Sequence, residues 1–240
     1  MKIILVTGAP GSGKTHTVRH SVLQHQRSSF GARWGLHRHG VNPQLTFHRS
    51  TDGSTVVAGG YVFDDHPRWR TRRNTVPANG GTDTLQPQST GLLAALLRGD
   101  MAKLGGGPAP ATVVVECCSI AKMGKLAILD ALLDADQLVC IELVRPRSSA
   151  VAALTARDRD TDGKGVRGVA AADVHEKYAK QVVAIREGLQ ARATARGLGN
   201  VVWRDDNMWW RTVEWRDADA AVEGALYHAI HPGPVKLGVD

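Results

Sequence analysis

The chain has 240 residues, of which 42% are hydrophobic and 22% charged, so it has the composition of a globular protein and the length for one α/β core. Its formal net charge of +7 favours a polyanionic partner, and nucleic acid is one such partner. Three cysteines are too few for a disulfide framework, and the absence of a signal-peptide pattern or an apolar run of about 18 residues predicts a soluble, intracellular protein with free, mostly buried thiols.

The first predicted element is an apolar strand at residues 2–7, and a helix is predicted from residue 14 onward. Between them the chain matches the phosphate-binding pattern G-x-x-x-x-G-K-[ST]. The matching residues are Gly8, Ala9, Pro10, Gly11, Ser12, Gly13, Lys14 and Thr15. Glycines at such positions let successive N–H groups point at phosphate oxygens. We expect Lys14 to reach the β- and γ-phosphates of ATP as an exposed charge, and the Thr15 hydroxyl to ligate Mg²⁺.

Residues 27–80 are interpreted as an irregular, polar insertion that contains a hairpin, with strands at 45–50 and 55–58 around a turn at 51–54. Arginines outnumber acids here, which is typical either of a solvated basic face or of a surface that binds nucleic-acid phosphates. For the second case, the residues expected to contact nucleic acid are Arg68, Trp69, Arg70, Arg72 and Arg73.

Three carboxylates are candidates for accepting a proton from a substrate hydroxyl. Asp65 follows a strand expected at 56–63. Asp83 precedes a helix expected at 85–104, where it either caps the helix or takes part in catalysis. Glu116 ends a buried strand at 112–116, the position of a metal-orienting carboxylate in many phosphate-binding proteins. We rank Asp83 first and Asp65 second as the base, and place Glu116 beside Mg²⁺.

The second half of the chain continues the alternation of strands and helices. A helix at 123–133 and a strand at 137–144 are predicted, followed by two helices at 148–157 and 170–196. Helix, charged loop, helix is the arrangement of a phosphate-covering lid, so the segment at about 157–169 is a candidate lid. Its candidate phosphate-contacting residues are Arg157 and Arg159, with Arg167 behind them. The alternative is surface charge paired with the neighbouring aspartates.

The last predicted elements are a strand at 200–204 and a helix at 218–230. Four of the six tryptophans fall between Trp203 and Trp215, and arginines separate some of them. Such a segment suits base stacking, a purine pocket or a small satellite core equally well. Together the elements predict a single domain over residues 1–240, a three-layer α/β/α fold whose parallel sheet has about five strands and binds ligands at the carboxyl ends of its strands.

Several motifs together resemble phage-type P-loop kinases that phosphorylate 5-hydroxymethyluracil in DNA. They are the P-loop at 8–15, the strand residues Gly59-Gly60-Tyr61, the turn Gly81-Thr82-Asp83, the strand ending in Glu116 and the arginine-bearing lid. The resemblance implies transfer of the γ-phosphate of ATP, with Mg²⁺, to the hydroxymethyl group of a modified base during thymidine hypermodification. It also implies a cytoplasmic protein, in the infected host cell if a phage encodes it. In that family Arg-Leu-Ser usually follows the Gly-Thr-Asp turn, whereas Thr84-Leu85-Gln86 follows it here.

Two other functions fit the same residues. A nucleoside or nucleotide kinase would use the same P-loop and lid on a free nucleotide, although the arginine-rich insertion is larger than a mononucleotide needs. A P-loop ATPase or DNA-binding switch would use hydrolysis to drive a conformational change, but the sequence lacks a clear Asp-Glu pair at the end of a strand. The sequence does not reveal the oligomeric state.

Overall fold

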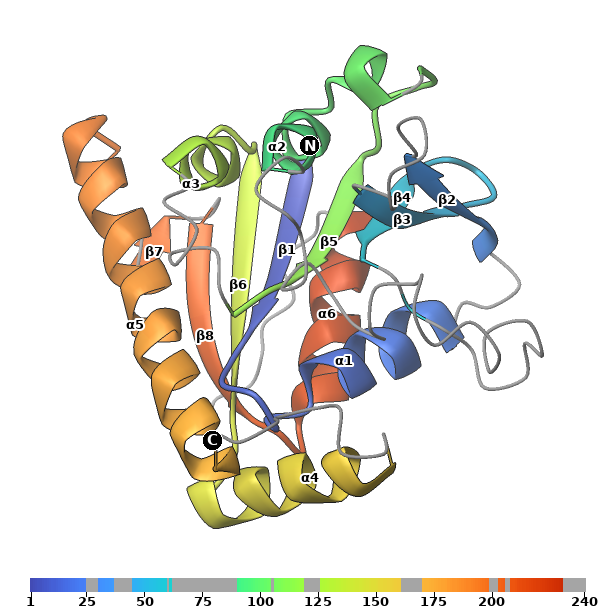
Figure 1. Ribbon diagram of the computed structural model, residues 1–240. Coiled ribbons are helices and arrows are strands. Elements are labelled where there is room, and N and C mark those ends of the chain that lie inside the picture. Colours follow the sequence, from blue (N-terminus) through green and yellow to red (C-terminus); the bar gives the residue numbers. More distant parts are fainter. Residues whose placement is uncertain are drawn as a thin grey trace.

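The computed structural model describes residues 1–24, 30–36, 45–59, 61, 90–104, 106–118, 126–160, 170–198, 203–205 and 208–230. Within these ranges eight strands form one sheet in the order β2-β3-β4-β5-β1-β6-β8-β7 (Figure 1). The strands are β1 (Lys2–Thr7), β2 (Phe30–Leu36), β3 (Leu45–Ser50), β4 (Thr55–Ala58), β5 (Thr112–Glu116), β6 (Gln137–Val144), β7 (Trp203–Asp205) and β8 (Met208–Glu214).

The middle of the sheet is parallel, and β1 lies at its centre. β1 pairs in parallel with β5 on one side and with β6 on the other, and β4 and β8 extend the parallel part outward. β2, β3 and β7 are joined to it by antiparallel pairing. The described sheet is therefore larger than the predicted sheet of about five strands. Every residue of β1 is buried, as expected for a strand with helices on both faces.

Helices cover both faces of the sheet, so the described part of the chain has three layers (Figure 1). One face packs against α2 (Thr90–Leu97), α3 (Leu126–Leu133) and α5 (Ala171–Ala195). The other face packs against the π-helix η1 (Val18–Gln24), which continues α1 (Lys14–Thr17), and against α6 (Ala218–Ile230). A short 3₁₀ helix, η5 (Met101–Leu104), follows α2. α4 (Arg147–Asp160) lies near the carboxyl ends of the parallel strands.

The tryptophan-rich segment differs most from its prediction. The last parallel strand is β8, whereas the strand predicted at 200–204 corresponds to the short antiparallel strand β7. Trp210 is buried on the α5 side of the sheet and Val213 on the α6 side. Arg211, Thr212 and Glu214 of β8 are exposed, so burial in this strand does not alternate with a period of two and no strand pattern is visible in the sequence. Trp210 thus packs in the main core, and not in the small satellite core that was one of the expected alternatives.

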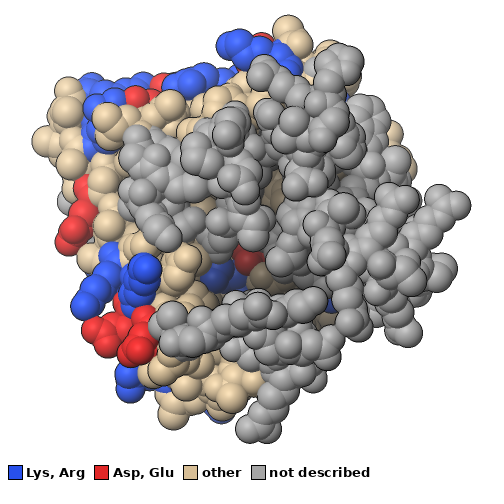
Figure 2. Space-filling model, in the orientation of Figure 1, with Lys and Arg blue, Asp and Glu red and all other residues tan. Residues whose placement is uncertain are grey.

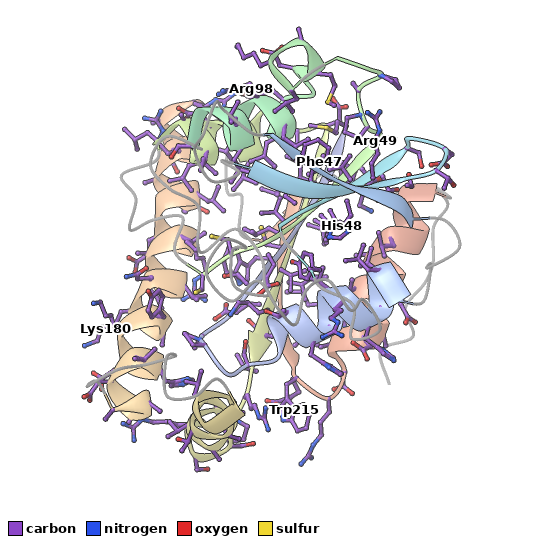
Figure 3. All side chains as sticks on the ribbon, turned by 45° about the vertical axis from the view of Figure 1, so that its right-hand side comes forward. Phe47, His48, Arg49, Arg98, Lys180 and Trp215 are labelled. Atoms are coloured by element: carbon purple, nitrogen blue, oxygen red, sulfur yellow. The ribbon has the colours of Figure 1, made fainter. Side chains whose placement is uncertain are left out.

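The predicted hairpin of β3 and β4 is confirmed, although β2 beside it was not predicted. Arg49 of β3, counted above among the basic residues, is buried and structural (Figure 3). Its guanidinium donates to the carbonyl oxygens of Gly53 at 3.2 Å and Pro108 at 2.5 Å. Arg49 therefore joins the hairpin turn to the segment that leads into β5.

The three cysteines are buried and form no disulfide, as predicted, and burial raises the pKa of the Cys140 thiol. Among the described residues, no helix is long and apolar enough to cross a membrane. On the face shown in Figure 2, the described Lys and Arg side chains are interspersed with Asp and Glu and do not form one basic patch.

Candidate functional site

The loop between β1 and α1 has three glycines with a positive φ angle, and at two of them a Cβ would also collide with backbone atoms. Gly8 and Gly11 have φ angles of +142° and +83°, a region that other residues rarely adopt. A Cβ on Gly8 would lie 2.5 Å from the carbonyl oxygen of Leu143, and a Cβ on Gly11 would lie 2.4 Å from that of Ala150. Both contacts are with backbone atoms, which cannot move aside easily. The loop is therefore held closely against the end of β6 and the first turns of α4.

Lys14 is buried inside this loop, so the prediction of an exposed charge was wrong. Only 6% of the residue is exposed. Its Nζ donates to the carbonyl oxygens of Gly8 at 2.9 Å and Ala9 at 3.4 Å. The carbonyl groups of the loop surround the ammonium group and take the place of water around it, which lets a charge be buried without a large penalty.

Two side chains donate hydrogen bonds to backbone carbonyl groups of the loop. The Nδ1 of His175 on α5 donates to the carbonyl oxygen of Pro10 at 2.9 Å, and the guanidinium of Arg145 donates to that of Gly11 at 3.2 Å. In a trans peptide the C=O and the following N–H point in opposite directions. The N–H of Gly11 therefore points away from His175.

Arg145 is itself fixed by two further contacts. Its Nε donates to the hydroxyl of Ser149 at 2.8 Å, and its guanidinium lies 4.4 Å from the ring centroid of Trp215. The backbone N–H of Trp215 donates to the carbonyl oxygen of Val144, which places this residue at the ends of β6 and β8 (Figure 3). Trp215 thus helps to hold the phosphate-binding motif through Arg145, a role that the sequence did not indicate.

Thr15 and Glu116 meet at the carboxyl ends of β1 and β5. The Thr15 hydroxyl donates to Oε1 of Glu116 at 2.6 Å, and the Tyr61 hydroxyl donates to Oε2 at 2.8 Å. Glu116 is 2% exposed and Tyr61 is 1% exposed. Parallel pairing of β1 and β5 places Glu116 beside Val6, two residues before the loop begins. Thr15 and Glu116, both expected beside Mg²⁺, therefore lie next to each other, and their role as metal ligands stays a prediction.

The residues of the loop fit a phosphate group. The Ser12 hydroxyl is buried and has no hydrogen-bond partner in the described part of the chain, and it lies 2.7 Å from where a Cβ on Gly8 would stand. A buried donor of this kind gains a partner when a phosphate oxygen enters the loop.

The same residues fit a Mg²⁺ ion. Thr15 and Glu116 offer oxygen atoms, which are the ligands that Mg²⁺ prefers. No group of three or more His, Cys, Asp or Glu residues within the described ranges could hold a metal ion by itself. Few protein ligands, completed by phosphate oxygens and water, are the usual arrangement for Mg²⁺ at a nucleotide.

Other predicted site residues are not described by the structure. Asp65 and Asp83 lie outside the described residues, as do the predicted nucleic-acid contacts Arg68, Trp69, Arg70, Arg72 and Arg73. Arg157 and Arg159 lie in the last turn of α4, where only the backbone is described, and most of the predicted lid falls outside the described ranges. These assignments stay predictions.

No model of a known protein family matches the chain. No curated protein matches it either. Among solved structures, the chain is similar to an unliganded sugar kinase from Janibacter sp., with 13% sequence identity and a TM-score of 0.31, over 96% of this chain and 94% of that one. Because this TM-score lies below 0.5, the functional conclusion comes from the residues of this chain alone.

Proposed function

We propose that this protein is an ATP-dependent kinase that phosphorylates an alcohol. One observation carries the proposal: a loop with the full phosphate-binding pattern stands at the end of the central parallel strand, with the hydroxyl of Thr15 hydrogen-bonded to the buried Glu116 of the neighbouring strand. The carboxyl ends of parallel strands are where ligands bind in folds of this class.

Each of the described residues has a role in this reaction. Lys14, now bonded to loop carbonyls, would turn to the β- and γ-phosphates, and the Ser12 hydroxyl would bond a phosphate oxygen. Thr15 and Glu116 would hold Mg²⁺, which neutralises charge on the phosphates when bound. Both oxygens of Glu116 already accept hydroxyl hydrogen bonds, which supports a metal-orienting role and leaves the base to Asp83 or Asp65.

Phosphoryl transfer to an alcohol needs one bond made and one broken. The acceptor oxygen bonds to the γ-phosphorus, the bond from that phosphorus to the β–γ bridging oxygen breaks, and ADP leaves with the electron pair. The proton of the hydroxyl passes to the base. A carboxylate near neutral pH is ionised and therefore ready to accept it.

For the acceptor, we propose the hydroxymethyl group of 5-hydroxymethyluracil in DNA. The arginine-rich run from Arg68 to Arg73 supports a polymer, because a DNA strand offers many phosphates and a mononucleotide offers one or two. The resemblance of the Gly81-Thr82-Asp83 turn and its companion motifs to DNA-modifying kinases supports the modified base. To reach a base inside a duplex, the enzyme would flip it out of the stack or act on single strands.

The test supplies γ-labelled ATP with three acceptors: an oligonucleotide containing 5-hydroxymethyluracil, the same oligonucleotide with thymine, and the free hydroxymethylated nucleotide. Label should enter only the modified oligonucleotide, and transfer should weaken as salt rises. If the free nucleotide is labelled better than the modified oligonucleotide, the acceptor is a nucleotide and not DNA. Equal ATP hydrolysis with and without acceptor would make the protein an ATPase. A Lys14→Met variant is the control that ties any label to this site.

A further inference from the structure

The buried hydrogen bond from Tyr61 to Glu116 connects the candidate metal carboxylate to a part of the chain far from it in sequence. Tyr61 follows β4, and Glu116 ends the neighbouring strand β5. The Tyr61 ring packs in the core on the α6 side of the sheet, with its centroid 6.0 Å from that of His48. Packing therefore fixes the ring, and the ring fixes where its hydroxyl lies.

Glu116 consequently has a defined orientation. One carboxylate oxygen accepts from Tyr61 at 2.8 Å and the other accepts from Thr15 at 2.6 Å. A carboxylate held at only one oxygen can rotate about its last bond, whereas one held at both cannot without losing a bond. Because Thr15 gives its hydrogen to Glu116, the lone pairs of its oxygen are left for a cation.

We propose that Tyr61 is a positioning residue for Mg²⁺: it fixes Glu116 so that the Thr15 hydroxyl presents its oxygen to the metal. This inference rests on the proposed function. Tyr61 itself touches neither nucleotide nor metal in this role. Removal of a residue that hydrogen-bonds to a metal ligand commonly weakens metal affinity about 10- to 100-fold, and we expect a loss of this size for Tyr61.

Tyr61 also stands just before the segment that carries the predicted bases Asp65 and Asp83. The hydrogen bond therefore ties the beginning of that segment to the metal carboxylate. Loss of the hydroxyl should weaken metal binding in the nucleotide complex and leave nucleotide binding without metal unchanged, because the hydrogen bond that is lost goes to Glu116 and not to the phosphate-binding loop.

The experiment compares the wild type with Tyr61→Phe, which removes one oxygen and keeps the ring. Mn²⁺ serves as the probe, and its binding to the complex with a non-hydrolysable ATP analogue is measured by electron paramagnetic resonance. We expect the Kd of Mn²⁺ to rise about 10- to 100-fold. The matched control is Tyr178→Phe, which removes a hydroxyl from a residue packed against the core on the other face of the sheet and should leave this Kd unchanged.

A Kd for Mn²⁺ within twofold of the wild type in a folded Tyr61→Phe protein would overturn the inference and leave a structural hydrogen bond. A lower melting temperature with an unchanged Kd for Mn²⁺ would overturn the inference as well. If the wild type binds no ATP analogue, the proposed function fails and this inference fails with it. Binding of the analogue without metal is therefore measured first for all three proteins.

A second measurement needs no variant at position 61. The chain has three tyrosines, so wild-type protein labelled with 3-fluorotyrosine gives three fluorine resonances, which Tyr178→Phe and Tyr227→Phe variants assign. Adding Mg²⁺ to the complex with the ATP analogue should shift the Tyr61 resonance and leave that of Tyr178 in place. An unchanged Tyr61 resonance at saturating Mg²⁺ would contradict the role proposed for it.

Discussion

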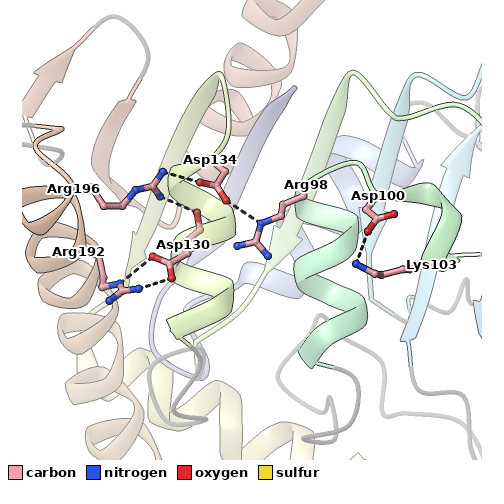
Figure 4. A network of polar contacts seen from close by, with 7 residues as sticks. All are labelled: Arg98, Asp100, Lys103, Asp130, Asp134, Arg192 and Arg196. Carbon is pink, nitrogen blue, oxygen red and sulfur yellow. Dashed lines mark hydrogen bonds and ion pairs between the residues drawn. The ribbon is translucent and has the colours of Figure 1, made fainter.

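The two ends of the parallel sheet hold their charged side chains in different ways. At the carboxyl end, Lys14 donates hydrogen bonds to backbone carbonyls and Glu116 accepts them from hydroxyl groups, and both residues are buried. At the amino end, arginines and aspartates pair directly with one another between α2, α3 and α5 (Figure 4). The residues of this network are Arg98, Asp130, Asp134, Arg192 and Arg196.

The ion pairs of this network join α3 to α2 and α5. Arg192 on α5 donates to both oxygens of Asp130 on α3, at 3.0 and 2.5 Å, and this hydrogen bonding holds the pKa of Asp130 below its usual value. Burial would raise the pKa of Asp134, but hydrogen bonds from Arg98 and Arg196 outweigh it and lower the pKa. These side chains are partly exposed, and such pairs contribute little to stability.

The comparison shows how a buried charge can stay ready for a ligand. A guanidinium–carboxylate pair satisfies both partners, so a ligand would have to replace one of them in order to use the other. Carbonyl oxygens around Lys14 stabilise the ammonium group but can be exchanged for phosphate oxygens, which interact with it more strongly. Variants at the two ends should therefore affect different properties.

The largest expected effect is on activity. Lys14→Met keeps the length of the side chain and removes its charge, so phosphoryl transfer should fall at least about 10²- to 10³-fold, the loss that follows removal of one donor to a developing charge. Arg192→Met, the matched change in the network, should leave the transfer rate unchanged. Rates from single-turnover assays with labelled ATP check both variants. Equal rates for the wild type and Lys14→Met would contradict the assignment of the loop.

The second prediction compares two glycines. Gly11→Ala places a Cβ 2.4 Å from a backbone oxygen at a φ of +83°, so the free energy of unfolding should fall by about 2–4 kcal/mol and binding of an ATP analogue should be lost. Gly91 lies in α2, and a Cβ there would meet nothing within 4 Å. Gly91→Ala should raise the free energy of unfolding by about 0.5–1 kcal/mol and leave binding unchanged. Chemical denaturation and calorimetry measure both, and tight binding by Gly11→Ala would contradict the close fit of the loop.

A third prediction concerns Lys2, a buried lysine at the amino end of β1 whose Nζ donates to the carbonyl oxygen of Ala225 at 2.8 Å. Burial lowers its pKa from 10.5 to about 8. Between these two values the unfolded chain binds more protons than the folded one, so stability should rise with pH, by up to about 3 kcal/mol from this group. Lys2→Met should abolish this rise in denaturation experiments between pH 8 and 10.5. If the stability of the variant rises with pH by the same amount, the rise comes from groups other than Lys2.

The smallest effect is expected in the network itself. Asp130→Asn should lower the melting temperature at neutral pH by no more than about 3 °C, because the pair is partly exposed. The folded pKa of Asp130 is depressed, so its contribution is present above the usual aspartate pKa of 3.8 and is lost as pH falls through the lower folded value. The melting temperatures of the variant and the wild type should therefore converge in acid. A difference between the two melting temperatures that grows as the pH falls below 3.8 would contradict the depressed pKa of Asp130.

How far the sequence predicts this molecule depends on the range of the interactions involved. The loop from Gly8 to Thr15 and the strands β1, β5 and β6 are predictable because each depends on residues that are neighbours in the chain. The pairing of Thr15 with Glu116 also follows, since parallel strands bring their carboxyl ends together.

The remaining features depend on contacts between distant segments. β8 buries one residue on each face, Trp210 and Val213, while the two residues between them are exposed, so the strand has no regular apolar period in the sequence. Arg145 directly follows β6, at the same edge of the sheet where Glu116 ends β5, and that position was a signal that the prediction did not use. His175 reaches Pro10 from 165 residues away, and no local pattern indicates such a contact. The burial of Lys14 likewise arises from the folded loop and not from its composition.

The measurement that tests the central claim most directly is a crystal structure of the protein with Mg²⁺ and a non-hydrolysable ATP analogue. We predict that the Nζ of Lys14 leaves the carbonyl oxygens of Gly8 and Ala9 and binds the β- and γ-phosphates, and that the Thr15 hydroxyl binds the metal while remaining hydrogen-bonded to Glu116. A nucleotide bound elsewhere, or phosphates in the loop with Lys14 still bonded to its carbonyl groups, would contradict this account.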